Sequence, residues 1–349
     1  MAATIYDHIA RNNRNTLLIT LLFPATLIIM ISLAIFLAIL ITKDEYLIQT
    51  GLQFSSVLHL DFFNLSQPEI TPYKTFLVAT LGYTATIAAP IITITAVWIF
   101  FSYYYGAKMI LSASHAKHIR KKSNPTVFRL VENVAIAAGL PMPKVYIIND
   151  ESLNAFATGR DPEHAAITLT TGIIEKLNKQ ELETVIAHEM AHIGNRDIRL
   201  MMIIITGVGV ISLLADIMFR CLRSVSSGRD KNGGAIILLL LFVALALTIF
   251  SFIIAPLLRF ALSRSQEYSA DTTAAMITRN PGALANALEK IATDSRVEVL
   301  DNMPTVGALC IANPLGKNRK RLSDSLAGLY ATHPPIENRI AALREMDRF

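Results

Sequence analysis

The residues best suited to chemistry form one short stretch, His188-Glu189-Met190-Ala191-His192. Residues 180–187 before it are good helix formers without glycine or proline, so we expect the stretch to lie within a helix. Residues four apart share one face of a helix, which brings the two imidazoles together. Glu189, one position along, can reach a water held by a metal bound there. This spacing is typical of zinc-dependent peptide hydrolysis, with two histidine ligands and a glutamate as general base.

Two histidines alone are an incomplete site, because catalytic zinc takes three protein ligands, and the pattern also arises by chance on solvated helices. A third ligand is available in residues 262–275, which lack glycine and proline and are predicted to be helical. Glu267 in this helix would complete a His, His, Glu set. Asp271, four residues later on the same face, would accept the second N–H of a ligand histidine. An exposed helix with scattered charges has the same appearance, and that alternative stays open.

The elements that must position these groups precede the motif helix. A helix is predicted at residues 127–139 and strands at residues 144–148 and 165–171, which gives a small antiparallel sheet. Between the strands lies a segment that is either an ordinary hairpin strand or an edge to which an extended peptide adds as a further strand: Asn154, Ala155, Phe156, Ala157, Thr158 and Gly159.

One further histidine stands in a loop near the C-terminus. His333 is held extended by Pro334 and Pro335, ahead of a predicted helix at residues 336–346. It could stabilise an oxyanion, although a lone loop histidine is more often a surface residue.

The composition is that of a membrane protein. The chain has 349 residues, of which 52% are hydrophobic and 17% charged, and its mean hydropathy is +0.44. Four apolar segments meet the length of about 20 residues that a membrane span requires; they are residues 16–42, 75–106, 200–219 and 235–258. The first is too long for a signal-peptide core and lacks a following cleavage site, so we expect a retained anchor.

Lysine and arginine in the flanking loops predict the orientation. Basic residues precede the first segment and follow the second, whereas the loop at residues 43–74 holds only Lys43 and Lys74 against four acidic residues. Both ends of this hairpin, and the region after residue 106, are therefore expected in the cytoplasm. The second pair of segments either spans the membrane or is re-entrant. The motif and Glu267 must lie on one side, which a pair of crossings allows. The loop between the two segments is basic, however, which favours a re-entrant hairpin.

These observations divide the chain into a membrane hairpin at residues 1–106, a first catalytic part at 107–199, a second hydrophobic hairpin at 200–258 and a second catalytic part at 259–349. The net charge of +5 mostly records membrane-flanking residues. A basic cluster at residues 317–321 lacks interleaved aromatic residues, so we expect contact with anionic lipid and no nucleic-acid partner. Cys221 and Cys310 belong to no motif, which suits a reducing cytoplasm.

The sequence resembles the HtpX-type membrane zinc metalloproteases, in the broader group that includes the CAAX prenyl endopeptidases. The resemblance covers Ser112 to the C-terminus, and one residue departs from it, since Gln266 stands where the family usually has a basic residue. The matching pieces are Asn154 to Gly159, Glu181-Leu182 before the H-E-x-x-H stretch, Ser263-Arg264 with Glu267 and Ala270-Asp271, and Thr332-His333-Pro334-Pro335 with Arg339-Ile340.

The resemblance implies an α+β fold, in which a zincin-like domain, mostly helical with a small antiparallel sheet, is combined with transmembrane helices. It implies one zinc ion per chain, Glu189 as base, and Asp271 beside a ligand histidine. It further implies that His333 or Arg339 stabilises the oxyanion and that residues 154–158 bind substrate. The ligands would be His188, His192 and Glu267.

The implied activity is cleavage of misfolded or damaged membrane proteins, in quality control under stress, at the cytoplasmic face of the inner (plasma) membrane. Three alternatives remain. A site-2-type protease would carry its motif inside an apolar span, whereas charged residues flank this one. A CAAX-type endopeptidase would need a large membrane chamber, for which four segments are few. An inactive membrane scaffold is disfavoured by the intact set of site residues.

Overall fold

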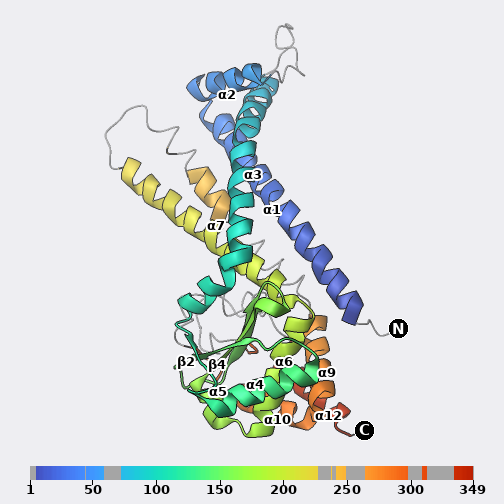
Figure 1. Ribbon diagram of the computed structural model, residues 1–349. Helices are drawn as coiled ribbons and strands as arrows, with labels where there is room; N and C mark the ends of the chain where they lie inside the picture. Colours follow the sequence, from blue (N-terminus) through green and yellow to red (C-terminus); the bar gives the residue numbers. More distant parts are fainter. Residues whose placement is uncertain are drawn as a thin grey trace. The chain divides into compact units, whose positions relative to one another are not determined.

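The computed structural model describes residues 5–43, 45–58, 72–226, 237, 241–248, 264–297, 309–312 and 334–348. The chain forms two compact units, each assembled from segments far apart in the sequence (Figure 1). The first contains residues 1–16, 101–206 and 256–349, and the second contains residues 17–100 and 207–255. The H-E-x-x-H stretch and Glu267 both belong to the first unit.

A four-stranded sheet forms one layer of the first unit. Its strand order is β1-β2-β4-β3, and the strands are β1 (Lys117–His118), β2 (Lys144–Ile148), β3 (Ala155–Gly159) and β4 (Ala165–Thr170). The sheet is mixed and not wholly antiparallel, because β2 pairs with β4 in parallel. Between β2 and β4 the chain passes through β3 and a short 3₁₀ turn, η1 (Pro162–His164), and so reverses direction twice. Strand β3 pairs with β4 in antiparallel and lies at the edge of the sheet.

Helices cover this sheet and supply the rest of the core. The expected segments form α4 (Pro125–Ala138), α6 (Lys179–Gly194), α9 (Arg264–Thr278), α10 (Pro281–Ile291) and α12 (Ile336–Met346), together with the short α5 (Thr171–Lys176). The ends of α4 follow from its sequence. The side chain of Asn124 accepts the backbone N–H of Val127 at the start, and Gly139 ends the helix in the left-handed region at φ 66°.

Helix α6 lies at the centre of the unit, packed against β3, α4, α9 and α10 (Figure 1). A capping box begins it, in which the Asn178 side chain accepts the Glu181 N–H and the Glu181 carboxylate accepts the Asn178 N–H. Lys290 of α10 then pairs with the buried Glu181 carboxylate at 2.7 Å. The helix is buried nearly all round, so its orientation, and that of the histidines on it, is fixed by packing.

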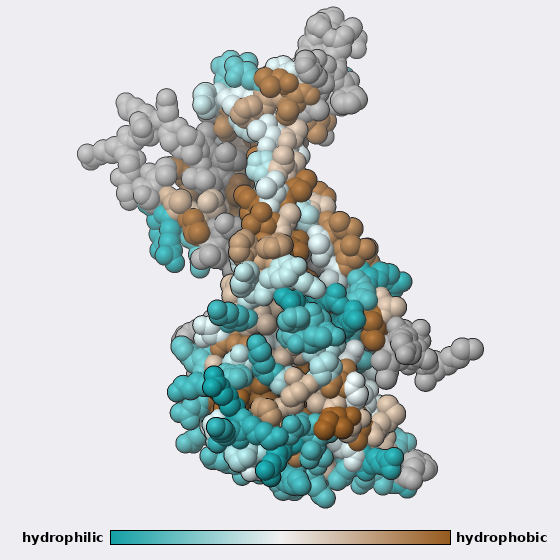
Figure 2. Space-filling model, in the orientation of Figure 1, coloured by the Kyte–Doolittle hydropathy of each residue, from teal (hydrophilic) through white to brown (hydrophobic). Residues whose placement is uncertain are grey.

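The second unit is built from long helices. Its parts of α1 (Ile5–Thr42) and α3 (Pro72–Ala113) lie within stretches, Ile9–Thr42 and Lys74–Ala113, that are long and apolar enough to cross a membrane. Large hydrophobic side chains on them face outward, including Leu21, which is 61% exposed. Figure 2 shows hydrophobic surface along these helices and hydrophilic surface over much of the first unit.

The loop expected at residues 43–74 contains a helix, α2 (Glu45–Val57), that the sequence pattern did not indicate. It packs tightly against α3, since a Cβ added to Gly51 would lie 2.6 Å from the carbonyl oxygen of Ala79. The third apolar segment is part of α7 (Asp197–Ser226). Most of residues 235–258 lie outside the described residues, and so does the topology of the second hydrophobic pair.

Candidate metal centre

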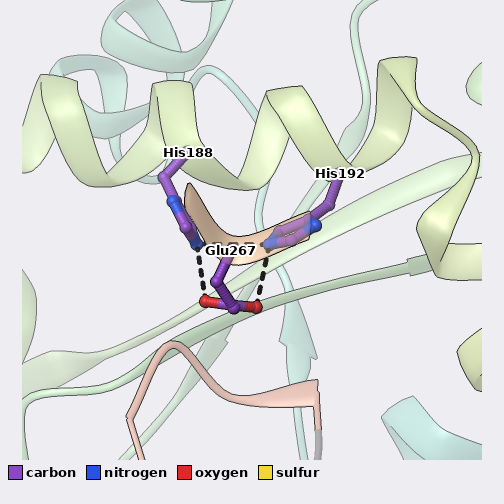
Figure 3. A group of neighbouring side chains, drawn as sticks. All are labelled: His188, His192 and Glu267. Carbon is purple, nitrogen blue, oxygen red and sulfur yellow. Dashed lines mark hydrogen bonds and ion pairs between the residues drawn. The ribbon is translucent and has the colours of Figure 1, made fainter. Parts of the chain in front are cut away.

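Three side chains from two helices converge as the donor spacing predicted. His188 and His192 stand one turn apart on α6, and Glu267 of α9 faces them with its carboxylate (Figure 3). The Nε2 atoms of the two histidines are 3.2 Å apart. The Glu267 oxygens lie 3.7 Å from His188 Nε2 and 3.6 Å from His192 Nε2. All three ligand atoms lie within 4.8 Å of one another.

This donor set fits zinc. Tetrahedral zinc with bonds of about 2.0–2.1 Å separates its ligand atoms by about 3.3 Å, close to the spacing here. Two imidazoles and one carboxylate leave a fourth position for water or substrate, as catalytic sites require. Glu189 Oε1 is buried at this centre without a hydrogen-bond partner in the part of the chain that the structure describes. A buried carboxylate oxygen of this kind is suited to a water on the open position.

His188 is held by a buried ion-pair network. Its Nδ1 lies 3.0 Å from Asp271 Oδ1, the contact that the spacing of Glu267 and Asp271 led us to expect. Arg339 of α12 donates to both oxygens of Asp271, from Nε at 2.8 Å and from Nη2 at 2.7 Å. Burial lowers the pKa of His188, which favours the neutral ring that can bind a metal. The pKa of Asp271 falls to about 2, because Arg339 outweighs the opposing effect of burial.

His192 is held by a residue that sequence reasoning missed. Its Nδ1 lies 2.9 Å from Asp197 Oδ2, at the start of α7. Although burial lowers the pKa of His192, the hydrogen bond with Asp197 and the charge of Glu267 raise it to about 9. Helical spacing could not indicate Asp197, since α6 ends at Gly194 and the chain turns through Arg196 at φ 61°. The sequence signal that could have indicated this contact is the presence of a carboxylate, Asp197, shortly after the motif helix.

Glu189 points from α6 toward the edge strand of the sheet. Burial raises its pKa to about 7, against the opposing effects of the charge of His192 and of the nearby backbone of Ala157 in β3. A carboxyl with a pKa near neutrality is well matched to a general base. Cys310 is fully buried near Glu189, and burial raises the pKa of its thiol, which favours the protonated form.

The structure places residues 154–158 beside the centre, with their side chains turned into the protein. Ala155 and Ala157 belong to one hydrophobic cluster and Phe156 to another, as the alternation of a strand requires. Asn154 donates to the carbonyl oxygens of Ser295 and Ala312. The outer edge of β3 meets another segment of the chain, since the Ile311 N–H donates to the Ala155 carbonyl at 2.9 Å.

Of the two residues expected to stabilise an oxyanion, the structure describes Arg339 alone. His333 lies outside the described residues. Arg339 is 1% exposed, and besides Asp271 its guanidinium contacts Glu267 Oε2 at 3.1 Å and the Ile311 carbonyl at 3.2 Å. These partners are a metal ligand, its neighbour and a backbone carbonyl. Arg339 is thus packed against the ligand Glu267, and its part in stabilising an oxyanion stays a prediction.

A buried H-E-x-x-H helix with a glutamate ligand from a second helix defines a zinc-dependent metallopeptidase. The model of peptidase family M48 matches residues 121–347, and the chain belongs to this family. The resemblance to HtpX-type proteases is confirmed, and His188, His192 and Glu267 form the zinc site of this metallopeptidase.

The relatives extend the match beyond the family region. A "Protease HtpX homolog" of Bacteroides fragilis (strain YCH46) is 40% identical over 340 residues, which cover 96% of this chain and 97% of that protein. One of Dictyoglomus turgidum is 42% identical over 247 residues, covering 71% of this chain and 78% of that one. A crystal structure of S. mikatae Ste24p has 18% identity and a TM-score of 0.43, covering 72% of this chain and 57% of that one. The family assignment rests on the sequence matches.

Proposed function

We propose that this metallopeptidase is an integral membrane endopeptidase that cleaves misfolded or damaged membrane proteins at the cytoplasmic face. The observation that carries the proposal is the position of Glu189, buried between the metal ligands and the backbone edge of β3. A base held there can serve the hydrolysis of a peptide that lies along that edge. The long apolar stretches in α1 and α3 support a bilayer as its place of work.

Each residue of the centre has a distinct task in this proposal. Glu189 takes a proton from the attacking water and returns it to the leaving amine. Zinc, when bound, lowers the pKa of water and polarises a carbonyl oxygen. Asp271 and Asp197 fix the ring orientation of His188 and His192 through Nδ1, which leaves each Nε2 directed at the metal position. Arg339 keeps Asp271 and Glu267 in place, and we propose this in preference to the oxyanion role.

The substrate-binding proposal for residues 154–158 takes a more specific form. Their side chains are buried, so a peptide would be recognised by the backbone of β3 and not by side-chain pockets. Main-chain pairing tolerates many sequences, which suits an enzyme for unfolded segments. Asn154 has a supporting task here, because its amide holds the chain around Ser295 and Ala312 next to β3.

The cytoplasmic orientation rests on the charge bias of the loops. Basic residues flank the first hairpin on the side of the catalytic region, and the intervening loop is acidic. Quality control under stress is the physiological role that we infer for such an enzyme. Its substrates would be membrane proteins whose cytoplasmic segments have lost their fold.

A paired assay tests the activity and the base together. The full chain and Glu189→Gln are purified in detergent with a chelator and then given zinc and an unfolded protein. We expect about one zinc ion in each and a rate for the variant lower by about 10²–10⁴-fold, the usual contribution of a general base. Retention of full activity by Glu189→Gln would refute the assignment of the base, and absence of zinc from both proteins would refute the site.

The substrate class needs a separate comparison in proteoliposomes. A membrane protein with a destabilised cytoplasmic loop, its stable parent and a farnesylated C-terminal peptide are offered to the same enzyme. We expect cleavage of the destabilised loop at a rate at least about tenfold above that of the stable parent. Preferential cleavage of the farnesylated peptide would instead identify a CAAX-type activity, and cleavage of none would favour a scaffold.

A further inference from the structure

Asn12 is a polar residue of α1 that lies ahead of the first apolar segment and contacts the supports of the metal centre. It is 1% exposed, although its neighbours Arg11 and Asn13 are exposed. It belongs to the same compact unit as the zinc ligands. We propose that Asn12 is a positioning residue of the zinc site, so that the first turns of the N-terminal helix form part of the catalytic unit and do not serve as an anchor only.

Every hydrogen-bonding group of the Asn12 amide is directed at this neighbourhood. Its Nδ2 donates to the carbonyl oxygen of Asn195 at 2.9 Å and to Asp197 Oδ1 at 2.5 Å. Its Oδ1 accepts from Gln266 Nε2 at 2.7 Å. Donors and acceptors are consistent at all three contacts, so the orientation of the amide is fixed by its partners.

The partners lead to two different metal ligands. Asp197 uses its other oxygen, Oδ2, to hold His192 Nδ1 at 2.9 Å. Gln266 directly precedes the ligand Glu267 on α9. One amide thus joins the support of a histidine ligand to the helix that carries the carboxylate ligand, across sequence separations of 185 and 254 residues.

Asn12 also holds the turn that gives Asp197 its position. The carbonyl of Asn195 lies at the end of α6, and Arg196 follows in the left-handed region at φ 61°, which a residue with a side chain seldom adopts. A hydrogen bond to the carbonyl before this turn and another to the carboxylate after it keep the two ends together. The conformation that directs Asp197 back to His192 therefore depends on a side chain from α1.

The physical consequence concerns metal affinity. Asp197 is buried, with 6% of its side chain exposed, so the loss of Asn12 leaves a carboxylate oxygen without its donor. The carboxylate is then free to rotate away from His192 toward other partners. Loss of Asp197, the direct hydrogen-bond partner of His192, would typically weaken metal affinity about 10–100-fold, and Asn12 acts one contact further from the metal.

The experiment measures zinc binding directly, with the full chain in detergent and in a Glu189→Gln background that prevents self-cleavage. Zinc dissociation constants are obtained by competition with a chelator for Asn12→Ala, Asn12→Asp and the control Asn13→Ala. Asn13 is the same residue type on the same helix, but it is exposed, and the contact that the described residues give it is a hydrogen bond from Arg199 at 3.2 Å.

We expect Asn12→Ala to weaken zinc binding about 3–10-fold, less than the loss of a direct partner of a ligand, and Asn13→Ala to change it by less than about twofold. Asn12→Asp keeps the volume but opposes a carboxylate to Asp197, so it should weaken binding further. The absorption spectrum of bound Co²⁺ should change in both Asn12 variants, because the geometry of its ligands is altered. A residue needed only for packing would lower thermal stability and leave the dissociation constant and the spectrum as in the parent.

A double-mutant cycle tests whether Asn12 acts through Asp197. In an Asp197→Ala background, Asn12→Ala should cost less zinc affinity than it does in the parent, since the carboxylate that it orients is gone and only its contact with Gln266 remains to be lost. Losses of zinc affinity that multiply independently in the two variants would overturn the proposal. Parental affinity in Asn12→Asp would also overturn it. Asn12→Asp preserves the side-chain volume, so it serves as the test if Asn12→Ala does not fold. Because the readout is metal binding, none of these outcomes depends on which substrates the enzyme cleaves.

Discussion

Arg339 is the cation on which two buried carboxylates depend. It contacts both oxygens of Asp271 and one of Glu267, and it is 1% exposed. Replacing it by Met would leave these charges in a buried site without compensation. We expect Arg339→Met to lower the free energy of unfolding of the zinc-free protein by about 3–5 kcal/mol, measured by urea titration in detergent.

The matched control lies on the same helix. Arg344 pairs with Glu289 at 3.0 Å, with 40% and 50% of the two side chains exposed. Solvent screens such a pair, so Arg344→Met should cost no more than about 1 kcal/mol. Equal costs for the two variants would show that the Arg339 network contributes nothing beyond a surface ion pair.

At this scale the ligands were predictable and their supports only partly so. His188, His192 and Glu267 follow from helical spacing and the donor chemistry of zinc, and the contact of Asp271 with His188 follows from the same periodicity. Asp197 and Asn12 obey no local period. One reaches the site through a turn and the other through a different helix, and such contacts exist only once the chain has folded.

Among the elements, α6 carries the chemistry and its N-terminus can be tested separately. Asn178→Ala removes one half of the capping box, so we expect a loss of about 1 kcal/mol in unfolding free energy. The zinc dissociation constant should stay within about twofold of the parent, because the histidine ligands lie about three and four turns away along α6. Lys179→Ala, at an exposed neighbouring position, is the control and should be nearly neutral. A loss of zinc binding in Asn178→Ala would mean that the cap also holds the site.

The elements with local signals were the ones that sequence reasoning found. Asn124 and Gly139 mark the ends of α4, and the alternation of β-formers marks β2. Helix α2 was missed because two of the residues that it buries, Gly51 and Ser55, are small and give no apolar signal, and it is held by a close approach of Gly51 to α3. The parallel pairing of β2 with β4 depends on where β3 lies, which no local pattern specifies.

At the scale of the whole molecule, the orientation in the membrane is the prediction to test. In a chain whose native cysteines are replaced, Tyr46→Cys on α2 and Ile136→Cys on α4 place single thiols at positions 73% and 74% exposed. A membrane-impermeant maleimide applied to spheroplasts should label Tyr46→Cys at once and Ile136→Cys only after lysis. The reverse pattern would place the catalytic unit outside the cytoplasm.

The assembly of the units could not be predicted from the sequence. Hydropathy identifies residues 16–42 and 75–106 as apolar. It does not indicate that residues 1–16 belong to the same compact unit as residues 101–206 and 256–349. Composition averages over a segment, whereas contacts such as those of Asn12 join residues that lie far apart in the sequence. The sequence predicts the N-terminal helix only as a membrane anchor, whereas its first turns belong to the compact unit that contains the metal ligands.

The contact of Ile311 with the outer side of β3 bears on solubility. An uncovered edge strand is a template on which other chains nucleate intermolecular sheets. At Ala155 this edge is satisfied by the protein's own backbone, and Ile311 and Ala312 are anchored in the hydrophobic core. Less of the strand can then recruit a second chain, so this edge is less able to seed an intermolecular sheet.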